Sequence, residues 1–365
     1  MKIDFFITSL SGGGAERVVC NLAGYLVRRG HVVNITALRG DNLAYEVNEK
    51  VGIYYLQKNY YRHHDKLYRV SEFKSVKNYF KQLSTEGLLV CFLELPVAYS
   101  LIFRSSIKRK LIICERNNPL FYPKYYQWIY KLYSHRADGC VCQTKENASW
   151  YQDAMKKSIP IEVIPNSISN KILEAPYSDC RDKTIITLGR LAPQKNQRMM
   201  IEAFAQIAKD YSDYSMIIYG EGPLRKELED LTKQLGIERR VSFPGFVNDV
   251  VEVMQHASMF VMTSDHEGMP NALQEAMAMR LPCISTDCGG GGARALIENG
   301  INGVLIKRND KDTLVKEMQR IIADKEYAKF LGSTACRIRR DCTPEKIHEK
   351  WEMFFIQIMG EVRKQ

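Results

Sequence analysis

Short apolar runs alternate with helical stretches along the whole chain, and this alternation constrains the fold more than any other feature. Runs of this kind are typical of parallel strands that are buried on both faces beneath helices. They fall into two groups, which predicts two α/β domains, each built on a parallel sheet. The expected strands are Ile3–Ile7, Val32–Ala37, Leu88–Leu93, Leu111–Cys114 and Gly139–Cys142 in the first group, and Ile185–Leu188, Ser215–Tyr219, Val241–Phe243, Phe260–Thr263, Cys283–Ser285 and Gly303–Ile306 in the second.

A polar segment at 164–179, interrupted by two prolines, separates the two groups and is expected to be a linker. We therefore expect an α/β protein of two doubly wound Rossmann-like domains that face a central cleft. The first domain is predicted at 1–168 and the second at 178–344. The terminal stretch, about 345–365, is helical by its periodicity and is expected to pack back onto the first domain.

The composition is that of a globular protein, with 45% hydrophobic and 26% charged residues among 365. The net charge of +10 lies in the first part of the chain, because residues 1–165 hold 24 Lys and Arg against 14 Asp and Glu, whereas residues 166–365 hold 28 against 28. Such asymmetry indicates a surface that meets an anionic partner, either lipid phosphates or nucleic acid, although a solvated basic face is the simpler alternative. No apolar run is long enough to cross a bilayer and no secretory signal pattern is present, so we expect a cytoplasmic protein. The ten cysteines form no C-x-x-C pair and are expected to be reduced thiols.

Glycine-rich segments follow several of the expected strands, where open α/β sheets bind their ligands. The first, at 11–17, has neither the spacing of a dinucleotide-binding loop nor the lysine of a P-loop. Another begins at Gly189 and carries Arg190 and Lys195, whose cationic groups can converge on one anion and neutralise a leaving diphosphate. A surface basic pair is the alternative. Two further glycine segments lie at 220–224, which contains Gly222, and at 286–293.

The run H-E-G-M-P-N-A-L-Q-E-A at 266–276 joins an expected strand to an expected helix. Free amides at that helix N-terminus, around Gly268, Met269, Pro270 and Asn271, can hold a diphosphate. Carboxylates are unsuited to binding that anion, so Glu267 is expected to accept hydrogen bonds from sugar hydroxyls and Glu275 from a ribose. The segment therefore predicts a nucleotide-sugar site, with an ordinary amphipathic helix as the alternative.

Six motifs together resemble the retaining glycosyltransferase family 4, whose members have the GT-B fold. They are G-G-G-A-E-R at 12–17, I-P-N at 164–166, G-R-L-x-x-x-K at 189–195, G-E-G-P at 220–223, F-x-G-F-V-x-D-V at 243–250 and E-G-M-P-N-A-L-Q-E-A at 267–276. The resemblance covers nearly the whole chain and is closest to a bacterial subgroup that builds surface polysaccharides and lipid-linked oligosaccharides. It implies that the donor is a nucleotide diphosphate sugar, which we expect to be UDP-galactose or a UDP-N-acetylhexosamine, and that no cofactor is needed.

The same resemblance implies roles for individual residues. Glu267 would contact the donor sugar and Glu275 the ribose, while Arg190 and Lys195 would contact the donor phosphates, so that no metal is expected. The first-domain loop around Gly13 and Gly14 would face the donor phosphates or the acceptor. The remaining donor-site positions implied by the resemblance are Gly189, Gly222, Phe246, Val247, Gly268, Met269, Pro270 and Asn271. The chain departs from the family at 114–119, where many members have a histidine. Glu115 or Asn117 is expected to fill its role as a catalytic residue, with a loop-capping acid as the alternative.

The acceptor implied by the resemblance is a saccharide, free or linked to polyprenyl diphosphate. Two segments of the basic first domain, 54–80 and 121–133, mix lysines and arginines with aromatic residues, a combination that suits the headgroup level of a membrane. The protein is accordingly expected at the cytoplasmic face of the membrane as a peripheral protein, unless these aromatic residues form the domain core. The aromatic residues of the first segment are Tyr54, Tyr55, Tyr60, Tyr61, Tyr68, Phe73 and Phe80.

Two other functions stay open on the sequence. A nucleotide-sugar epimerase of similar fold would consume donor without any acceptor. A basic nucleic-acid-binding protein would explain the charge but not Glu267 and Glu275, so no nucleic-acid partner is expected.

Overall fold

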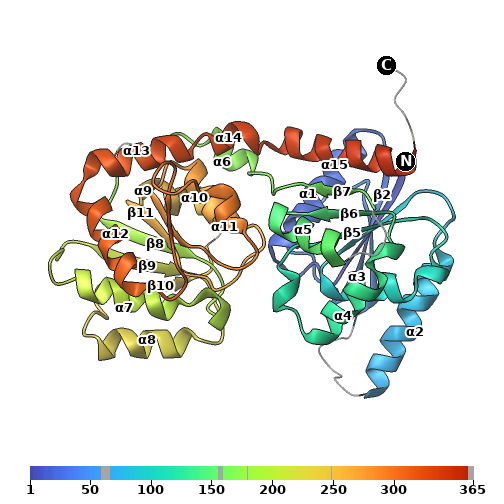
Figure 1. The fold of residues 1–365 in the computed structure, drawn as a ribbon, viewed down its shortest axis with the longest axis horizontal. Helices are drawn as coiled ribbons and strands as arrows, with labels where there is room; N and C mark the ends of the chain where they lie inside the picture. The colour runs from blue at the N-terminus through green and yellow to red at the C-terminus, as the bar shows by residue number, and fades with distance from the viewer. Residues whose placement is uncertain (59–65, 155–158, 179, 248, 361–365) are drawn as a thin grey trace. The chain divides into compact units, whose positions relative to one another are not determined.

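The computed structural model describes residues 1–58, 66–154, 159–178, 180–247 and 249–360, which form two compact units (Figure 1). One unit comprises Met1–Ser167 together with Glu345–Gln365, and the other comprises Ile168–Pro344. Both units are α/β structures built on a parallel sheet.

In the first unit, the described residues form a seven-stranded sheet in the order β3-β2-β1-β4-β5-β6-β7. Neighbouring strands pair in parallel throughout, so all carboxyl ends meet at one edge. The strands are β1 (Lys2–Ile7), β2 (Val32–Arg39), β3 (Gly52–Gln57), β4 (Leu88–Phe92), β5 (Lys110–Cys114), β6 (Gly139–Cys142) and β7 (Ile161–Val163). The helices are α1 (Gly14–Arg28), α2 (Lys66–Gln82), α3 (Glu94–Ile102), α4 (Lys124–Tyr133), α5 (Lys145–Ala154) and α15 (Pro344–Met359), with short 3₁₀ turns η2 (Arg104–Ser106), η3 (Pro119–Phe121) and η4 (Ser134–Arg136).

Two hydrophobic cores cover the two faces of this sheet, because side chains alternate between faces along each strand. Ile3, Phe5 and Ile7 of β1 pack against α1 and α15. Phe6 of the same strand packs on the opposite face, in the core that includes α2, α3, α4 and α5.

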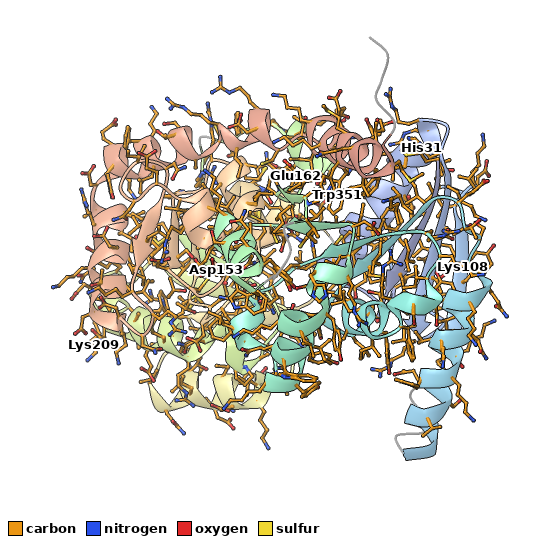
Figure 2. All side chains as sticks on the ribbon, turned by 45° about the vertical axis from the view of Figure 1, so that its right-hand side comes forward. His31, Lys108, Asp153, Glu162, Lys209 and Trp351 are labelled. Atoms are coloured by element: carbon orange, nitrogen blue, oxygen red, sulfur yellow. The ribbon has the colours of Figure 1, made fainter. Side chains whose placement is uncertain are left out.

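Helix α15 belongs to the first unit, although it is distant in sequence from all the other elements of that unit. It presents Ile347, Trp351, Phe354 and Phe355, spaced as one helical face, to the core formed by α1 and the sheet. Trp351, labelled in Figure 2, is fully buried and stacks on Phe92 with ring centroids 5.7 Å apart.

In the second unit, the described residues form a six-stranded sheet in the order β10-β9-β8-β11-β12-β13, again with parallel pairing throughout. The strands are β8 (Thr184–Leu188), β9 (Ser215–Tyr219), β10 (Val241–Gly245), β11 (Met259–Met262), β12 (Cys283–Thr286) and β13 (Val304–Ile306). The helices are α6 (Asn170–Glu174), α7 (Gln197–Ile207), α8 (Arg225–Gln234), α9 (Val250–His256), α10 (Asn271–Ala278), α11 (Gly292–Leu296), α12 (Lys311–Ala323), α13 (Lys325–Ala335) and α14 (Ile338–Asp341), with the 3₁₀ turn η5 (Pro193–Lys195). One face is covered by α7, α8 and α12, and the other by α6, α9, α10 and α11.

The buried strands expected from the apolar runs are all present, and the structure adds two strands at the edges of the first sheet. The β3 strand was not predicted because its side chains are mostly half-buried; β7 has only three residues. The predicted linker also differs, since it contains the short helix α6, whose Ile172 is buried in the second unit's core.

The first aromatic segment, 54–80, was predicted to suit the headgroup level of a membrane, and this prediction is wrong for part of the segment. Phe80 is fully buried among the helices of the first unit, whereas Tyr54 and Phe73 are exposed. Tyr60 and Tyr61 lie outside the described residues, as does the side chain of Tyr68. Among the residues that the structure describes, no helix has the length and apolar character needed to cross a membrane.

Candidate nucleotide-sugar site

The loops at the carboxyl edge of the second sheet are joined to one another by backbone hydrogen bonds. These bonds link the ends of β8, β9, β10, β11 and β12 into one continuous surface of backbone. Such a surface is preorganised, because each loop is held by its neighbour as well as by its own strand. The bonds, each from a donating amide to an accepting carbonyl, run from Gly189 to Tyr219 (3.0 Å), from Leu191 to Glu221 (2.9 Å), from Gly220 to Gly245 (2.8 Å), from Asp265 to Gln194 (2.8 Å) and from Glu267 to Gly289 (2.9 Å).

Glycines allow two of these loops to approach closely. A Cβ on Gly220 would lie 2.1 Å from the Gly189 carbonyl oxygen, and one on Gly222 would lie 2.3 Å from the Leu191 carbonyl oxygen. Real Cβ atoms do not come within 3.0 Å of other atoms, so a side chain at either glycine would push the β8 and β9 loops apart. The predicted glycine loop at 220–224 thus has a packing role against the loop that carries Arg190.

The third glycine contact joins the loop before α10 to the first residue of α11. A Cβ on Gly292 would lie only 1.6 Å from the Gly268 carbonyl oxygen and 2.9 Å from Pro270 Cδ. Gly268, Met269 and Pro270 are therefore positioned by Gly292, which the sequence placed in a separate glycine-rich segment. Pro270 is the residue before the helix, and α10 begins at Asn271.

Lys195 and Glu267 meet at this edge although they are 72 positions apart in sequence. Lys195 Nζ donates to Glu267 Oε1 at 2.5 Å, with the two side chains 23% and 12% exposed. The 3₁₀ turn η5 brings the lysine there, and Gln194 fixes the turn by donating from its side chain to the His266 carbonyl at 2.7 Å. The two predicted functional residues thus form an ion pair at the surface of the loop cluster.

Arg190, by contrast, is exposed and forms no ion pair within the described part of the chain. Its carbonyl oxygen accepts a hydrogen bond from the Gln197 side chain at 2.9 Å, which fixes the backbone while the guanidinium extends into solvent. An exposed guanidinium with no carboxylate partner among the described residues suits the binding of an incoming anion.

Glu275 is buried within α10, whose Leu273, Ala276 and Met277 pack in the core. Farther along the same edge, Phe246 is 78% exposed, an unusual degree for a phenylalanine, and Val247 is half-buried. Gly245, immediately before them, has a φ of +89°, which a side chain would oppose.

The glycine loop of the first unit is organised by a tyrosine and a buried carboxylate. The Gly13 amide donates to the Tyr45 hydroxyl at 3.1 Å, and that hydroxyl donates to the Gly13 carbonyl at 3.0 Å. Glu16 lies beneath the loop, and burial raises the pKa of its carboxyl. Gly14 is exposed at the first position of α1.

Glu115 lies at the end of β5 with its carboxylate turned inward. Oε1 accepts from the amides of Arg116 (2.8 Å) and Asn117 (2.9 Å) and from the Tyr122 hydroxyl (2.6 Å), while Oε2 accepts from the Tyr151 hydroxyl (2.8 Å). Burial raises its pKa to about 7 despite these donors. Asn117 Oδ1 likewise accepts from the next amide, at 2.9 Å. This arrangement favours the loop-capping alternative for Glu115.

The chain has a single Asp-x-Asp sequence, Asp310-Lys311-Asp312, a pattern that can hold a metal. Here Asp310 caps α12 instead, accepting from the Thr313 amide at 3.0 Å and from the Thr313 hydroxyl at 2.8 Å. Across the described ranges, no three His, Cys, Asp or Glu side chains are grouped so that they could hold a metal ion.

Two protein-family models match the chain. Residues 12–170 match Glycosyltransferase Family 4, and residues 170–337 match Glycosyl transferases group 1. An uncharacterized glycosyltransferase of Haemophilus influenzae is 28% identical over 359 residues, covering 96% of this chain and 99% of the relative.

A second relative comes from Campylobacter jejuni and is named as an α-1,4-N-acetyl-D-galactosaminyltransferase that acts on a GalNAc-containing chain on PP-undecaprenol. It is 26% identical over 371 residues, covering 100% of this chain and 99% of the relative. Among solved structures, Anabaena HepE in complex with UDP has a TM-score of 0.80 at 19% identity, over 98% of this chain and 100% of that one. The motifs, the two family models and the two-sheet architecture agree: the chain belongs to glycosyltransferase family 4 and has the GT-B fold.

Proposed function

We propose that this protein transfers a sugar from a UDP-sugar, UDP-galactose or a UDP-N-acetylhexosamine, to a glycan carried on polyprenyl diphosphate. The transfer would retain the anomeric configuration and need no metal. The Lys195–Glu267 ion pair within the joined loops carries the proposal. It places a cation for phosphate and an acceptor for sugar hydroxyls side by side, which a nucleotide sugar requires.

The donor would lie along the carboxyl edge of the second sheet. Arg190 and Lys195 would contact its diphosphate together with the amides of Gly268–Asn271. The exposed ring of Phe246 would stack on the base, and Glu275 would accept from the ribose hydroxyls. The binding of UDP by HepE, which has the same fold, supports a uridine nucleotide.

Donor binding would exchange the partners of the ion pair. Lys195 would turn from Glu267 to the diphosphate, and Glu267 would accept hydrogen bonds from the sugar. The bond between the anomeric carbon and the diphosphate oxygen would break as the acceptor hydroxyl attacks from the same face. The hydroxyl proton would pass to a phosphate oxygen, so no protein nucleophile is required. Lys195 and Arg190 would stabilise the charge on the leaving UDP, each by a few kcal/mol, on the order of 10²–10³ in rate.

The acceptor is proposed from the Campylobacter relative, whose name gives a glycan on PP-undecaprenol. Epimerase and nucleic-acid-binding functions gain no support, since the relatives reported above are glycosyltransferases.

A cluster of exposed apolar side chains on η3 and α4, here called the α4 patch, would hold the protein at the membrane. It follows directly after the 115–118 loop and is flanked by the exposed Lys124 and Lys131. Aromatic side chains with adjacent lysines favour an anionic lipid surface. The patch consists of Leu120 (58% exposed), Phe121 (41%), Tyr125 (60%) and Trp128 (61%).

Vesicle sedimentation tests the membrane proposal. Replacing Tyr125 and Trp128 together by serine should weaken binding to phosphatidylglycerol-containing vesicles at least tenfold, because each buried aromatic side chain contributes about 1.5–3 kcal/mol. Phe330→Ser is the matched control, since Phe330 is 49% exposed on α13 of the second unit. Equal binding by the double variant and the control would rule out the α4 patch as the membrane contact.

The enzymatic proposal is tested with a panel of radiolabelled nucleotide sugars and a membrane lipid extract. Label should enter the lipid fraction from one UDP-sugar, and Glu267→Ala should abolish this. Glu298→Ala, which removes an exposed carboxylate of the same unit, should not. Donor turnover without labelled lipid would instead indicate an epimerase or a soluble acceptor.

A further inference from the structure

Arg116 lies at the carboxyl edge of the first sheet, two residues beyond the end of β5. Its guanidinium is 5.6 Å from the centre of the Phe92 ring, at the end of β4. Its Nη2 donates to Asn166 Oδ1, just beyond β7, and the same oxygen accepts from Gln143 Nε2, just beyond β6, at 2.8 Å. The guanidinium therefore sits over four neighbouring strand ends.

The backbone of Arg116 is held by the inward-facing carboxylate of Glu115. That carboxylate accepts from the Arg116 and Asn117 amides and from the hydroxyls of Tyr122 and Tyr151, so it ties the loop to η3 and α5. Because its backbone is anchored in this way, Arg116 loses little conformational freedom when its side chain binds a ligand. Glu115 is thus a positioning residue, and the residue that it positions is Arg116.

The charge of Arg116 is not neutralised by a carboxylate within 4 Å among the described residues. Glu115 is adjacent in sequence, but its oxygens are bound by four other donors. Burial lowers the pKa of Arg116 to about 10, because the loss of water outweighs the attraction of the neighbouring Glu115 carboxylate. Four other arginines of the same unit are paired: Arg29 with Glu352, Arg39 with Glu72, Arg104 with Asp138, and Arg109 with Asp4.

A partly buried cation without a counterion is costly, and an anion that arrives with the substrate would remove the cost. We propose that Arg116 binds a phosphate group of a substrate. The guanidinium fork matches two phosphate oxygens. This inference rests on the proposed function, which supplies two sources of that chemistry: the UDP diphosphate of the donor and the diphosphate of the lipid acceptor.

The test compares Arg116→Gln with Lys108→Gln, which removes an exposed cation of the same unit (Lys108 is labelled in Figure 2). Three quantities are measured: the dissociation constant of UDP, the KM of the acceptor glycan on polyprenyl diphosphate, and the KM of the same glycan on an uncharged alkyl chain. We expect Arg116→Gln to weaken the phosphate-bearing ligand about 10- to 100-fold. Lys108→Gln should change none of the three.

The pattern identifies the source of the phosphate. If Arg116 contacts the lipid diphosphate, only the KM of the diphosphate acceptor rises; if it contacts the donor, UDP binding weakens with either acceptor. Unchanged values in all three measurements, or equal losses in the Lys108 variant, would overturn the proposal.

Two further measurements separate this inference from folding and from the proposed function. Arg116→Lys keeps the charge but loses the fork, and should recover part of the affinity if Arg116→Gln is less stable. Calorimetric titration with inorganic diphosphate needs no turnover. If the wild type transfers no sugar, the proposed function fails, and equal diphosphate binding by wild type and Arg116→Gln would overturn the inference as well.

Discussion

Replacing Gly292 by alanine should disable the donor site while leaving the sheet intact. The added Cβ would lie 1.6 Å from the Gly268 carbonyl oxygen, whereas real Cβ atoms keep at least 3.0 Å, so the two loops must separate by about 1.4 Å. The atom met is backbone rather than the end of a flexible side chain, and Pro270 Cδ at 2.9 Å limits the movement further. The substitution would therefore displace residues 268–270, which follow Glu267 and precede α10.

A displacement of about 1 Å in a group that positions a substrate can lower the rate about 100-fold. We therefore expect Gly292→Ala to reduce kcat/KM for the UDP-sugar by at least that factor. The free energy of unfolding should fall by only about 1–3 kcal/mol, the usual cost of adding a carbon atom to a well-packed region. Transfer is measured with a saturating acceptor and varied donor, and unfolding with urea.

Gly303→Ala is the matched control. Gly303 belongs to the same unit, but its added Cβ would meet the flexible Ile297 side chain and the Cys283 carbonyl at 3.2–3.3 Å. Transfer by this variant should stay within a few-fold of wild type. Normal kinetics in Gly292→Ala, or equal losses in both variants, would refute the argument that the Gly268–Gly292 contact shapes the donor site.

Three other predictions concern contacts within each unit. Lys195→Met and Glu267→Gln should each lower kcat/KM about 100-fold or more, and the loss in the double variant should differ from the product of the single losses, because the paired groups lie 2.5 Å apart; a double-mutant cycle with fully additive losses would contradict the pairing. Tyr151→Phe should raise the pKa of Glu115 further above about 7, because the ionised carboxylate loses a donor, and the acid limb of the rate profile should move about one pH unit upward; an unmoved limb would show that Glu115 ionisation does not affect the loop. His348 is buried and its pKa is lowered to about 4, so the unfolded chain binds more protons between pH 4 and 6.5, and stability is lost as the pH falls through that range. Between pH 7 and 5 the wild type should therefore lose about 2 kcal/mol more stability than His348→Phe in urea unfolding, and parallel pH dependences would contradict this.

The buried parts of both sheets could be predicted from sequence because continuous apolar runs leave little choice of structure. The edge strands could not, since β3 is half-exposed along its length and β7 is three residues long. Phe80 was misread for a related reason: its basic neighbours suggested a surface, whereas its own position on α2 faces the core.

The candidate site was predictable where spacing along the chain determines it. Glu267 and Glu275 are separated by one loop and the first turns of α10, so local pattern predicts their spacing, while their roles in binding stay predictions. The Lys195–Glu267 pair joins residues 72 positions apart, and the Gly268–Gly292 contact joins segments that follow two different strands, β11 and β12. Such contacts depend on which strands are neighbours, which local pattern does not specify. The role of Arg116 stayed open on the sequence for the same reason, because only the structure shows that no described carboxylate forms an ion pair with it.

Hydrogen exchange with and without UDP, followed by mass spectrometry, tests most directly where the nucleotide sugar binds. The account predicts slower exchange in the four segments 189–196, 220–224, 245–247 and 267–275, and loss of that protection in Gly292→Ala. Protection by UDP confined to other parts of the chain, with these four segments unchanged, would contradict the placement of the donor on the second unit.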